Sequence, residues 1–522
     1  MRRNFGTGAA CAGLLLSSFS FGQTAFETRV REVLARPQFK HSRFGLAVYE
    51  VEDGRPLYRL NAEQLFVPGS TTKLVTMGSA LKLIGADYQF RTSLYRTGEV
   101  SKDGTVHGDL VVKPGGDLNL SGRVQAGGTL AFQNVDHAYW PTPGAAVVEG
   151  DPIAPIRAMA KDAAAKGIKR VTGQLYVDVS MFPAGDRELG SGVALSPIVI
   201  NDNVVDMFVG PGAQAGERPR IRVSPDTAFV RITNRMTTGA AGSAMEVRVV
   251  SDEKREDGGR QIVMEGSVPA GQEPSLRVYK MTDPASYARF VFREALEQAG
   301  VVFESPITDV NPAVEWGGLY TSDRLLAEHL SPPFVEDAKF TLKVSQNLHA
   351  STAPYLVGAI VGGKHADAID EGFRQERKML EAAGLDLSGA MQSDGAGGAA
   401  MYTPDFMCSY LRWLSAQTFF ERLAPGLPVL GVNGTLWDIQ TKSPAAGKVF
   451  AKTGTYAAED LLHEALIVTG KGLAGYMTTR DGHRVAFAFY VNFVSGDPAT
   501  VTHMAGETLG ELATGVWESV WQ

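Results

Sequence analysis

The two ends of this chain carry matching patterns, which restrict the possible folds more than any other feature does. Residues 25–34 have apolar positions at the spacing of an amphipathic helix, and 44–51 then alternate as a strand does before a hairpin. Near the other end, 473–479 and 485–493 form a second strand pair around a short turn, and a helix is expected over 500–521. These patterns predict one antiparallel sheet that is built from both ends of the chain and covered by terminal helices.

The middle of the chain, residues 93–317, has a different pattern. Gly, Pro and Asp interrupt short alternating segments, as at 113–117 and 251–258, and one clear helical pattern lies at 153–165. A chain of 522 residues is too long for a single core, so more than one domain is expected. We therefore expect residues 93–317 to form a strand-rich insertion of one or two subdomains.

Helical patterns return after this insertion. Four segments have the spacing of helices: 334–342, 350–362, 366–383 and 404–416. With the patterns at the two ends, they predict an α/β (α+β) fold in which a discontinuous domain, residues 23–92 and 318–522, carries the insertion.

Residues 1–22 have the pattern of a secretory signal peptide. Arg2 and Arg3 precede an apolar run over 9–21, and small residues precede a cleavage site near Gly22. A buried N-terminal helix is the alternative. Cleavage would leave Cys408 as the only cysteine, and export without a disulfide fits a bacterial periplasm. The apolar run is shorter than the ~20 residues that span a bilayer, so no transmembrane anchor is expected.

Charge and ligand patterns exclude several classes of function. The formal net charge is -7, and it becomes -9 after cleavage because the removed segment contains two arginines and no acid. A mildly acidic chain without a basic run is a poor candidate for binding nucleic acid. The nine histidines are scattered, and no His-Glu-x-x-His or cysteine cluster occurs, so we expect neither a metal nor a cofactor.

Ser70 and Lys73 form one of three Ser-x-x-Lys patterns, the others being Ser79 with Lys82 and Ser251 with Lys254. On a helix this spacing places both side chains on one face, where the amine can take the hydroxyl proton. Only Ser70 follows a Pro-Gly pair and precedes an apolar helix, which places it at a helix N-terminus where backbone N–H groups are free. A simple N-cap is the alternative.

Lys452, Thr453 and Gly454 form the only Lys-Ser/Thr-Gly pattern of the chain, and they follow 449–451 as part of a predicted strand. Alternation along the strand lets the lysine project into a cleft, and the glycine leaves room for a substrate against the strand edge. An amine and a hydroxyl side by side suit a carboxylate ligand. A strand that ends in a turn is the alternative.

Ser345 and Asn347 form the only Ser-x-Asn pattern, between two predicted helices. A hydroxyl that relays a proton and an amide that both donates and accepts would face the same cleft if the connection is a loop. An exposed loop or a helix cap is the alternative. A related pattern, Ser393-Asp394-Gly395, lacks the amide, and we expect it to be a turn near the site.

In this order, the three motifs resemble those of penicillin-binding proteins and β-lactamases. Over nearly the whole mature length the sequence resembles the penicillin-binding protein 4 type of D-alanyl-D-alanine carboxypeptidase/endopeptidase, serine peptidase family S13. Further matching segments are 173–178 with Phe182, 201–203, 394–397, 427–428, 434–436 and 451–455. The chain departs from the family pattern at Leu118, Ala396 and Ser351, and by an extra apolar segment at 461–471.

This resemblance implies a transpeptidase/β-lactamase-like domain, an antiparallel sheet flanked by helices, and a covalent mechanism. Ser70 would attack the carbonyl of a terminal D-Ala-D-Ala bond, Lys73 would be the general base, and Ser345 would pass the proton to the leaving amine. Lys73 must then be neutral for part of the time, which burial and the proximity of Lys452 would promote.

The same resemblance implies how the substrate binds. Asn347 would hold the peptide amide, and Lys452 with Thr453 would bind the C-terminal carboxylate. The backbone N–H groups of Ser70 and Thr455 would form the oxyanion hole. The expected partners are peptidoglycan peptides with terminal D-Ala, and β-lactam antibiotics as covalent inhibitors. A β-lactamase or esterase on the same framework, and a non-catalytic wall-binding protein, are the alternative functions.

Overall fold

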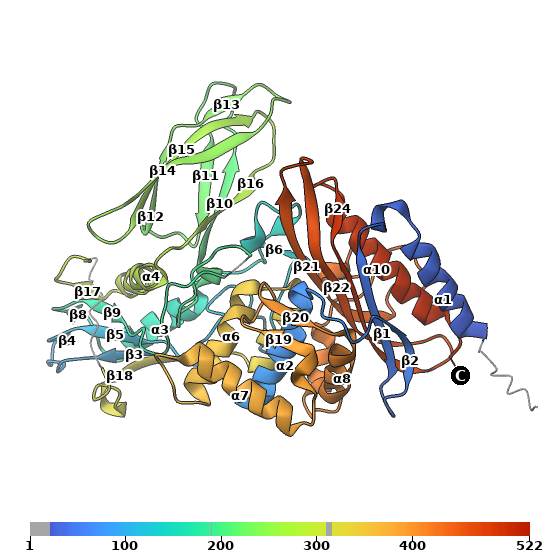
Figure 1. Ribbon diagram of the computed structural model, residues 1–522. Coiled ribbons are helices and arrows are strands. Elements are labelled where there is room, and N and C mark those ends of the chain that lie inside the picture. Colours follow the sequence, from blue (N-terminus) through green and yellow to red (C-terminus); the bar gives the residue numbers. More distant parts are fainter. Residues whose placement is uncertain (1–20, 189, 309–315, 522) are drawn as a thin grey trace, which may run out of the picture.

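The computed structural model describes residues 21–188, 190–308 and 316–521 (Figure 1). The expected signal peptide lies almost entirely outside these residues. Among the described helices, none is long and apolar enough to cross a membrane.

A six-stranded antiparallel sheet joins the two ends of the chain, as predicted. Its order is β2 (Pro56–Leu60), β1 (Arg43–Glu50), β23 (Arg484–Asn492), β22 (Ala465–Thr478) and β21 (Val449–Asp460), with β24 (Val494–Gly496) also paired to β22. Helices α1 (Phe21–Leu34) and α10 (Val501–Glu518) lie side by side over one face (Figure 1). Every residue of β23 after Arg484 is buried, because helices cover both faces of the sheet, and this explains its unbroken apolar run.

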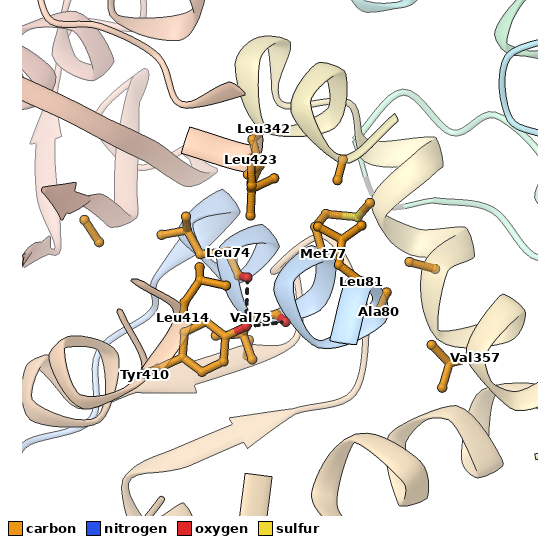
Figure 2. Close-up of a cluster of buried hydrophobic side chains, with 14 of the residues drawn as sticks. Leu74, Val75, Met77, Ala80, Leu81, Leu342, Val357, Tyr410, Leu414 and Leu423 are labelled. Atoms are coloured by element: carbon orange, nitrogen blue, oxygen red, sulfur yellow. Dashed lines mark hydrogen bonds between the residues drawn. The ribbon is translucent and has the colours of Figure 1, made fainter. Parts of the chain in front are cut away.

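The opposite face of the sheet packs against a helical lobe. Its helices are α2 (Thr72–Ile84), α5 (Phe334–Val344), α6 (Asn347–Ile360), α7 (Ala368–Ala382), α8 (Pro404–Ser415) and α9 (Phe420–Leu423), with a small hairpin of β19 (Ala390–Gln392) and β20 (Ala400–Tyr402). Helix α2 is central, and its residues 72–81 are all buried. Figure 2 shows its apolar side chains enclosed by those of neighbouring helices, with the Tyr410 hydroxyl directed at the carbonyl oxygens of Leu74 (3.2 Å) and Val75 (3.1 Å). The start of α2 is therefore held in a rigid core.

The strand-rich region between these parts has its own core. Its elements are β3 (Arg91–Arg96), β4 (Thr105–Val106), β5 (Leu110–Lys113), β6 (Val135–Asp136), β7 (Ala145–Ala146), α3 (Ala154–Ala165), β8 (Arg170–Val171), β9 (Leu175–Val177), β10 (Val204–Gly210), β11 (Arg220–Ser224), β12 (Val230–Asn234), β13 (Thr237–Gly239), β14 (Glu246–Lys254), β15 (Arg260–Pro269), β16 (Ser275–Lys280), α4 (Pro284–Gln298), β17 (Val302–Phe303) and β18 (Leu325–Leu330). They form small sheets, of which β18-β3-β5-β9 and β11-β10-β16 are two. Strands β10 to β16 rise above the rest of the molecule (Figure 1).

Most predicted elements are confirmed, with two clear differences. One clear helix was predicted in the strand-rich region, but α4 is a second, with Asp283 as its N-cap. The extra apolar segment 461–471 does not separate two strands. It lengthens β21 and β22 into one long hairpin, so β22 begins well before the predicted residue 473. The domain boundaries at residues 93 and 317 stay a prediction, and β18 pairs with β3 across them.

A fully buried ionic network joins the strand-rich region to the helical lobe. Arg123 donates to Asp136 (2.7 Å) and to both carboxylate oxygens of Asp202 (3.1 and 2.5 Å). His349 of α6 lies between Asp202 (3.0 Å) and Asp337 of α5 (2.7 Å). Burial alone lowers the pKa of His349, but the two carboxylates more than offset this and raise it to about 9. The imidazole is therefore charged at neutral pH and ties the two regions together.

This buried network should contribute to the stability of the fold, and replacing Arg123 tests that contribution. Arg123→Met would leave the nearly fully buried carboxylates of Asp136 and Asp202 without their shared guanidinium. We expect the free energy of unfolding to fall by about 3–5 kcal/mol, measured by urea denaturation. Arg377→Met is the control, because Arg377 is largely exposed and pairs with Glu381 at the surface. An Arg123 variant as stable as the control would contradict the prediction.

Candidate active site

Ser70 and Lys73 lie at the start of α2, where the sequence placed them. Ser70 belongs to a 3₁₀ turn, Gly69–Thr71, that runs directly into the helix, and Lys73 lies in the first helical turn. Lys73 Nζ donates a hydrogen bond to Ser70 Oγ over 2.7 Å. The amine is therefore in position to accept the hydroxyl proton when it is neutral.

Three further groups surround the Lys73 amine. Nζ lies 2.6 Å from Asn347 Oδ1, 3.3 Å from the Ala396 carbonyl oxygen and 3.4 Å from Ser345 Oγ. The Ala396 carbonyl belongs to a turn in which Asp394 accepts backbone hydrogen bonds, so the 393–395 motif is a turn beside the site, as expected. Every hydrogen-bond partner of this amine among the described residues is a neutral oxygen atom.

The lysines at the site have lowered pKa values. Burial lowers the pKa of Lys73 to about 7, although the charges of Glu188 and Asp394 act in the opposite direction. Burial also lowers the pKa of Lys452 well below its usual value, and the charges of Lys73 and Lys471 add to this effect. Of the two expected causes, burial does lower the pKa of Lys73, whereas the charge effect between the two lysines acts on Lys452.

Ser345 and Asn347 lie at the junction of two helices. Ser345 ends α5 in the left-handed conformation, with φ of 65°, and Asn347 begins α6. Lys452 Nζ donates to Ser345 Oγ over 2.9 Å, so Ser345 lies between the two lysine amines. Tyr139 of the strand-rich region donates to the Ser345 carbonyl oxygen (2.5 Å) and accepts from the Asn347 N–H (2.7 Å). Tyr139 could not be predicted as a site residue, because no local motif marks it.

Strand β21 forms the other wall of the site. Gly454 lies against the turn that carries Ser70, where a Cβ atom would stand 2.0 Å from the Pro68 carbonyl oxygen and 2.9 Å from the Ser70 nitrogen. A Cβ on Gly69 would stand 2.5 Å from the Thr455 nitrogen. Glycine at both positions therefore lets the backbone N–H groups of Ser70 and Thr455 approach each other closely.

A cavity of about 240 Å³ opens on Ser70. Its polar lining consists of hydroxyls and one amine, and its apolar lining comes from β22, α10 and the segment before β21. The lining residues are Ser70, Ser345, Thr435, Leu436, Ile439, Thr453, Thr455, Lys471, Gly472, Leu473, Gly506 and Leu509. Four of the eight predicted residues, Ser70, Ser345, Thr453 and Thr455, line this cavity. The other four, Lys73, Asn347, Lys452 and Gly454, are in contact with the same groups from behind. The structure adds Thr435, which hydrogen-bonds to Thr453 (2.7 Å), and Lys471.

One cluster has the composition of a metal site. Asp136, His137 and Asp202 offer three ligand atoms within 4.8 Å of one another. Arg123 already bonds to both carboxylates, and His137 donates to Asp202 and Asp206 when it is protonated. Burial alone lowers the pKa of His137, but Asp136 and Asp206 raise it to about 10, which disfavours metal binding. The cluster fits an internal ion network better than a cation site.

Comparison with known proteins identifies relatives over nearly the full length. Residues 26–508 match the model of the D-Ala-D-Ala carboxypeptidase 3 (S13) family. The D-alanyl-D-alanine carboxypeptidase of Actinomadura sp. (strain R39) is 26% identical over 93% of this chain and 85% of its own length. The D-alanyl-D-alanine carboxypeptidase DacB of Haemophilus influenzae is 23% identical over 94% of each chain.

Solved structures agree on the fold. Crystal structures of penicillin binding protein 4 (dacB) from Haemophilus influenzae superpose with TM-scores of 0.68 and, for a complex with a novel β-lactam, 0.67. They are 19% and 20% identical, and they cover 94% and 93% of this chain and 99% and 98% of their own. The resemblance inferred from the motifs is confirmed: the chain belongs to the D-Ala-D-Ala carboxypeptidase 3 (S13) family.

Proposed function

We propose that the protein cleaves the terminal D-Ala-D-Ala bond of peptidoglycan stem peptides, and D-Ala cross-links between them, through an acyl-enzyme on Ser70. The observation that carries this proposal is the 2.7 Å contact between Ser70 Oγ and a lysine amine whose pKa burial lowers to about 7. An ordinary lysine is charged at neutral pH and cannot accept a proton. The N-terminal pattern supports a periplasmic location as part of the same proposal.

The chemical step follows from these contacts. Neutral Lys73 takes the proton of Ser70 as Oγ attacks the carbonyl carbon of the penultimate D-Ala. The tetrahedral oxyanion is stabilised by the backbone N–H groups of Ser70 and Thr455. When the C–N bond breaks, Ser345 passes a proton from a lysine amine to the leaving amine of the terminal D-Ala. Water then hydrolyses the ester and restores Ser70.

The binding residues follow from the walls of the site. The Asn347 side chain would hold the peptide amide of the acyl part. The terminal carboxylate would lie at the hydroxyl-lined end of the cavity, near Thr453 and Thr455. We assign β-lactams as covalent inhibitors, because they present a strained amide and a carboxylate to the same groups. The β-lactam complex of the Haemophilus influenzae protein supports this assignment.

The first test replaces the nucleophile. We expect Ser70→Ala to abolish the covalent adduct with labelled benzylpenicillin and to slow D-Ala release from muropeptides at least about 1,000-fold, because no other group can form the ester. Ser251→Ala is the matched control, because Ser251 belongs to another Ser-x-x-Lys pattern, which lies on β14. Mass spectrometry of the digested muropeptides measures D-Ala loss and cross-link cleavage.

Two results would overturn the proposal. An adduct that survives in Ser70→Ala would exclude this serine as the nucleophile. Rapid turnover of benzylpenicillin by the wild-type protein, without cleavage of muropeptides, would identify a β-lactamase on the same framework.

The second test uses pH. Lys73 is protonated below a pKa of about 7 and neutral above it, so the acylation rate should rise about tenfold per pH unit below pH 7 and level off above it. Benzylpenicillin labelling between about pH 5.5 and 8.5 measures this rate, and circular dichroism at each pH verifies folding. Lys73→Arg should be inactive throughout, because a guanidinium is not deprotonated in this range. A flat profile in the wild-type protein would contradict the role of Lys73.

A further inference from the structure

Lys471 brings a third lysine amine to the site. It lies on β22 directly opposite Thr455 of β21, and Lys471 Nζ donates to Thr455 Oγ1 over 2.8 Å. Residues opposite each other in an antiparallel pair project to the same face of the sheet. Lys471 therefore lies beside the hydroxyls of Thr453 and Thr455, in the cavity that also contains Ser70.

The contacts of Lys452 bear on the role implied by the family resemblance, in which this lysine binds the terminal carboxylate together with Thr453. Lys452 is fully buried, and its amine donates to Ser345 Oγ (2.9 Å) and to the Thr453 carbonyl oxygen (2.8 Å). Lys452 is not among the residues that line the cavity, whereas Lys471 is the one lysine among the described lining residues. Two of the Lys452 donor positions are thus already used within the protein.

The charge state favours Lys471 as the cation of the cavity. Burial lowers its pKa to about 8, while the charge of Asp438 acts in the opposite direction, so most Lys471 amines remain protonated at neutral pH. Lys452 has its pKa lowered much further. Among the described residues, no carboxylate forms an ion pair with Lys471, so an anion from outside the chain can become its partner.

The remaining lining matches a carboxylate with an apolar substituent. Hydroxyls of Thr435, Thr453 and Thr455 supply neutral donors, while Leu473 and Leu509 supply apolar surface. A cation with several hydroxyl donors is a strong site for a carboxylate, because hydrogen bonds between ionised partners are shorter and stronger than neutral ones.

We propose that Lys471, with the hydroxyls of Thr453 and Thr455, binds the terminal carboxylate of the substrate, and that Lys452 positions Ser345 instead. This inference rests on the proposed function, and it identifies the residue that supplies the positive charge for the substrate carboxylate. A purely structural role for Lys471 is the competing explanation, since its side chain packs beside Gly506 of α10. The two explanations differ in whether the effect of a substitution depends on the substrate carboxylate.

The test compares benzylpenicillin with its methyl ester, which lacks the negative charge. For Lys471→Met we expect the second-order rate constant of Ser70 acylation to fall about 10- to 100-fold with benzylpenicillin and by less than about threefold with the ester. Lys471→Arg should recover most of the lost rate, because it keeps the charge. Lys448→Met is the control, because Lys448 is an exposed lysine directly before β21.

Each outcome decides the proposal. A loss confined to benzylpenicillin supports it. An equal loss with both compounds shows a structural role and overturns it, as does an unchanged rate with benzylpenicillin. If neither compound acylates the wild-type protein, the proposed function itself fails. This outcome can be told apart from a failure of the Lys471 proposal, because it is seen in the wild-type protein and not only in the variant.

Discussion

The carboxylate of Asp202 holds together parts of the chain that lie far apart in the sequence. It is 1% exposed and accepts hydrogen bonds from Arg123 and His137 of the strand-rich region and from Gln346 and His349 of the helical lobe. A buried charge without partners would cost several kcal/mol, so the burial of this carboxylate depends on these contacts. Gln346 is the middle residue of the Ser-x-Asn segment, and the geometry of the site therefore depends on this carboxylate.

The strand-rich region is thus part of the construction of the site. Tyr139 holds the backbone on both sides of Gln346, and the network around Asp202 holds the Gln346 side chain. This support explains how Ser345 keeps a left-handed conformation, which a non-glycine residue adopts only when its surroundings compensate for the strain. The separation of Ser70 from Ser345 along the sequence leaves room for the elements that fix their relative positions.

The sequence predicted the frame of the molecule better than it predicted the environment of the site. Both terminal strand pairs and the helices around Ser345 follow from periodicity, and the motifs identified all eight residues that the structure brings together. Periodicity missed α4 and the long β21–β22 hairpin, because short apolar segments do not distinguish a strand extension from a connection. Tyr139 and Lys471 carry no motif, and they reach the site only through tertiary contacts that a single sequence does not encode locally.

The site contains three lysines, and the physics of burial explains how it accommodates them. Three charged amines in a space with little water would repel one another strongly, and desolvation would add a further cost to each charge. The three lysines differ in their exposure, which reduces this cost. Lys73 and Lys452 are fully buried, whereas Lys471 reaches the cavity. The buried amines are then suited to proton transfer, and the amine at the cavity is suited to an anion. A carboxylate bound beside Lys471 would also weaken its repulsion of Lys452, and the pKa of Lys452 would then rise.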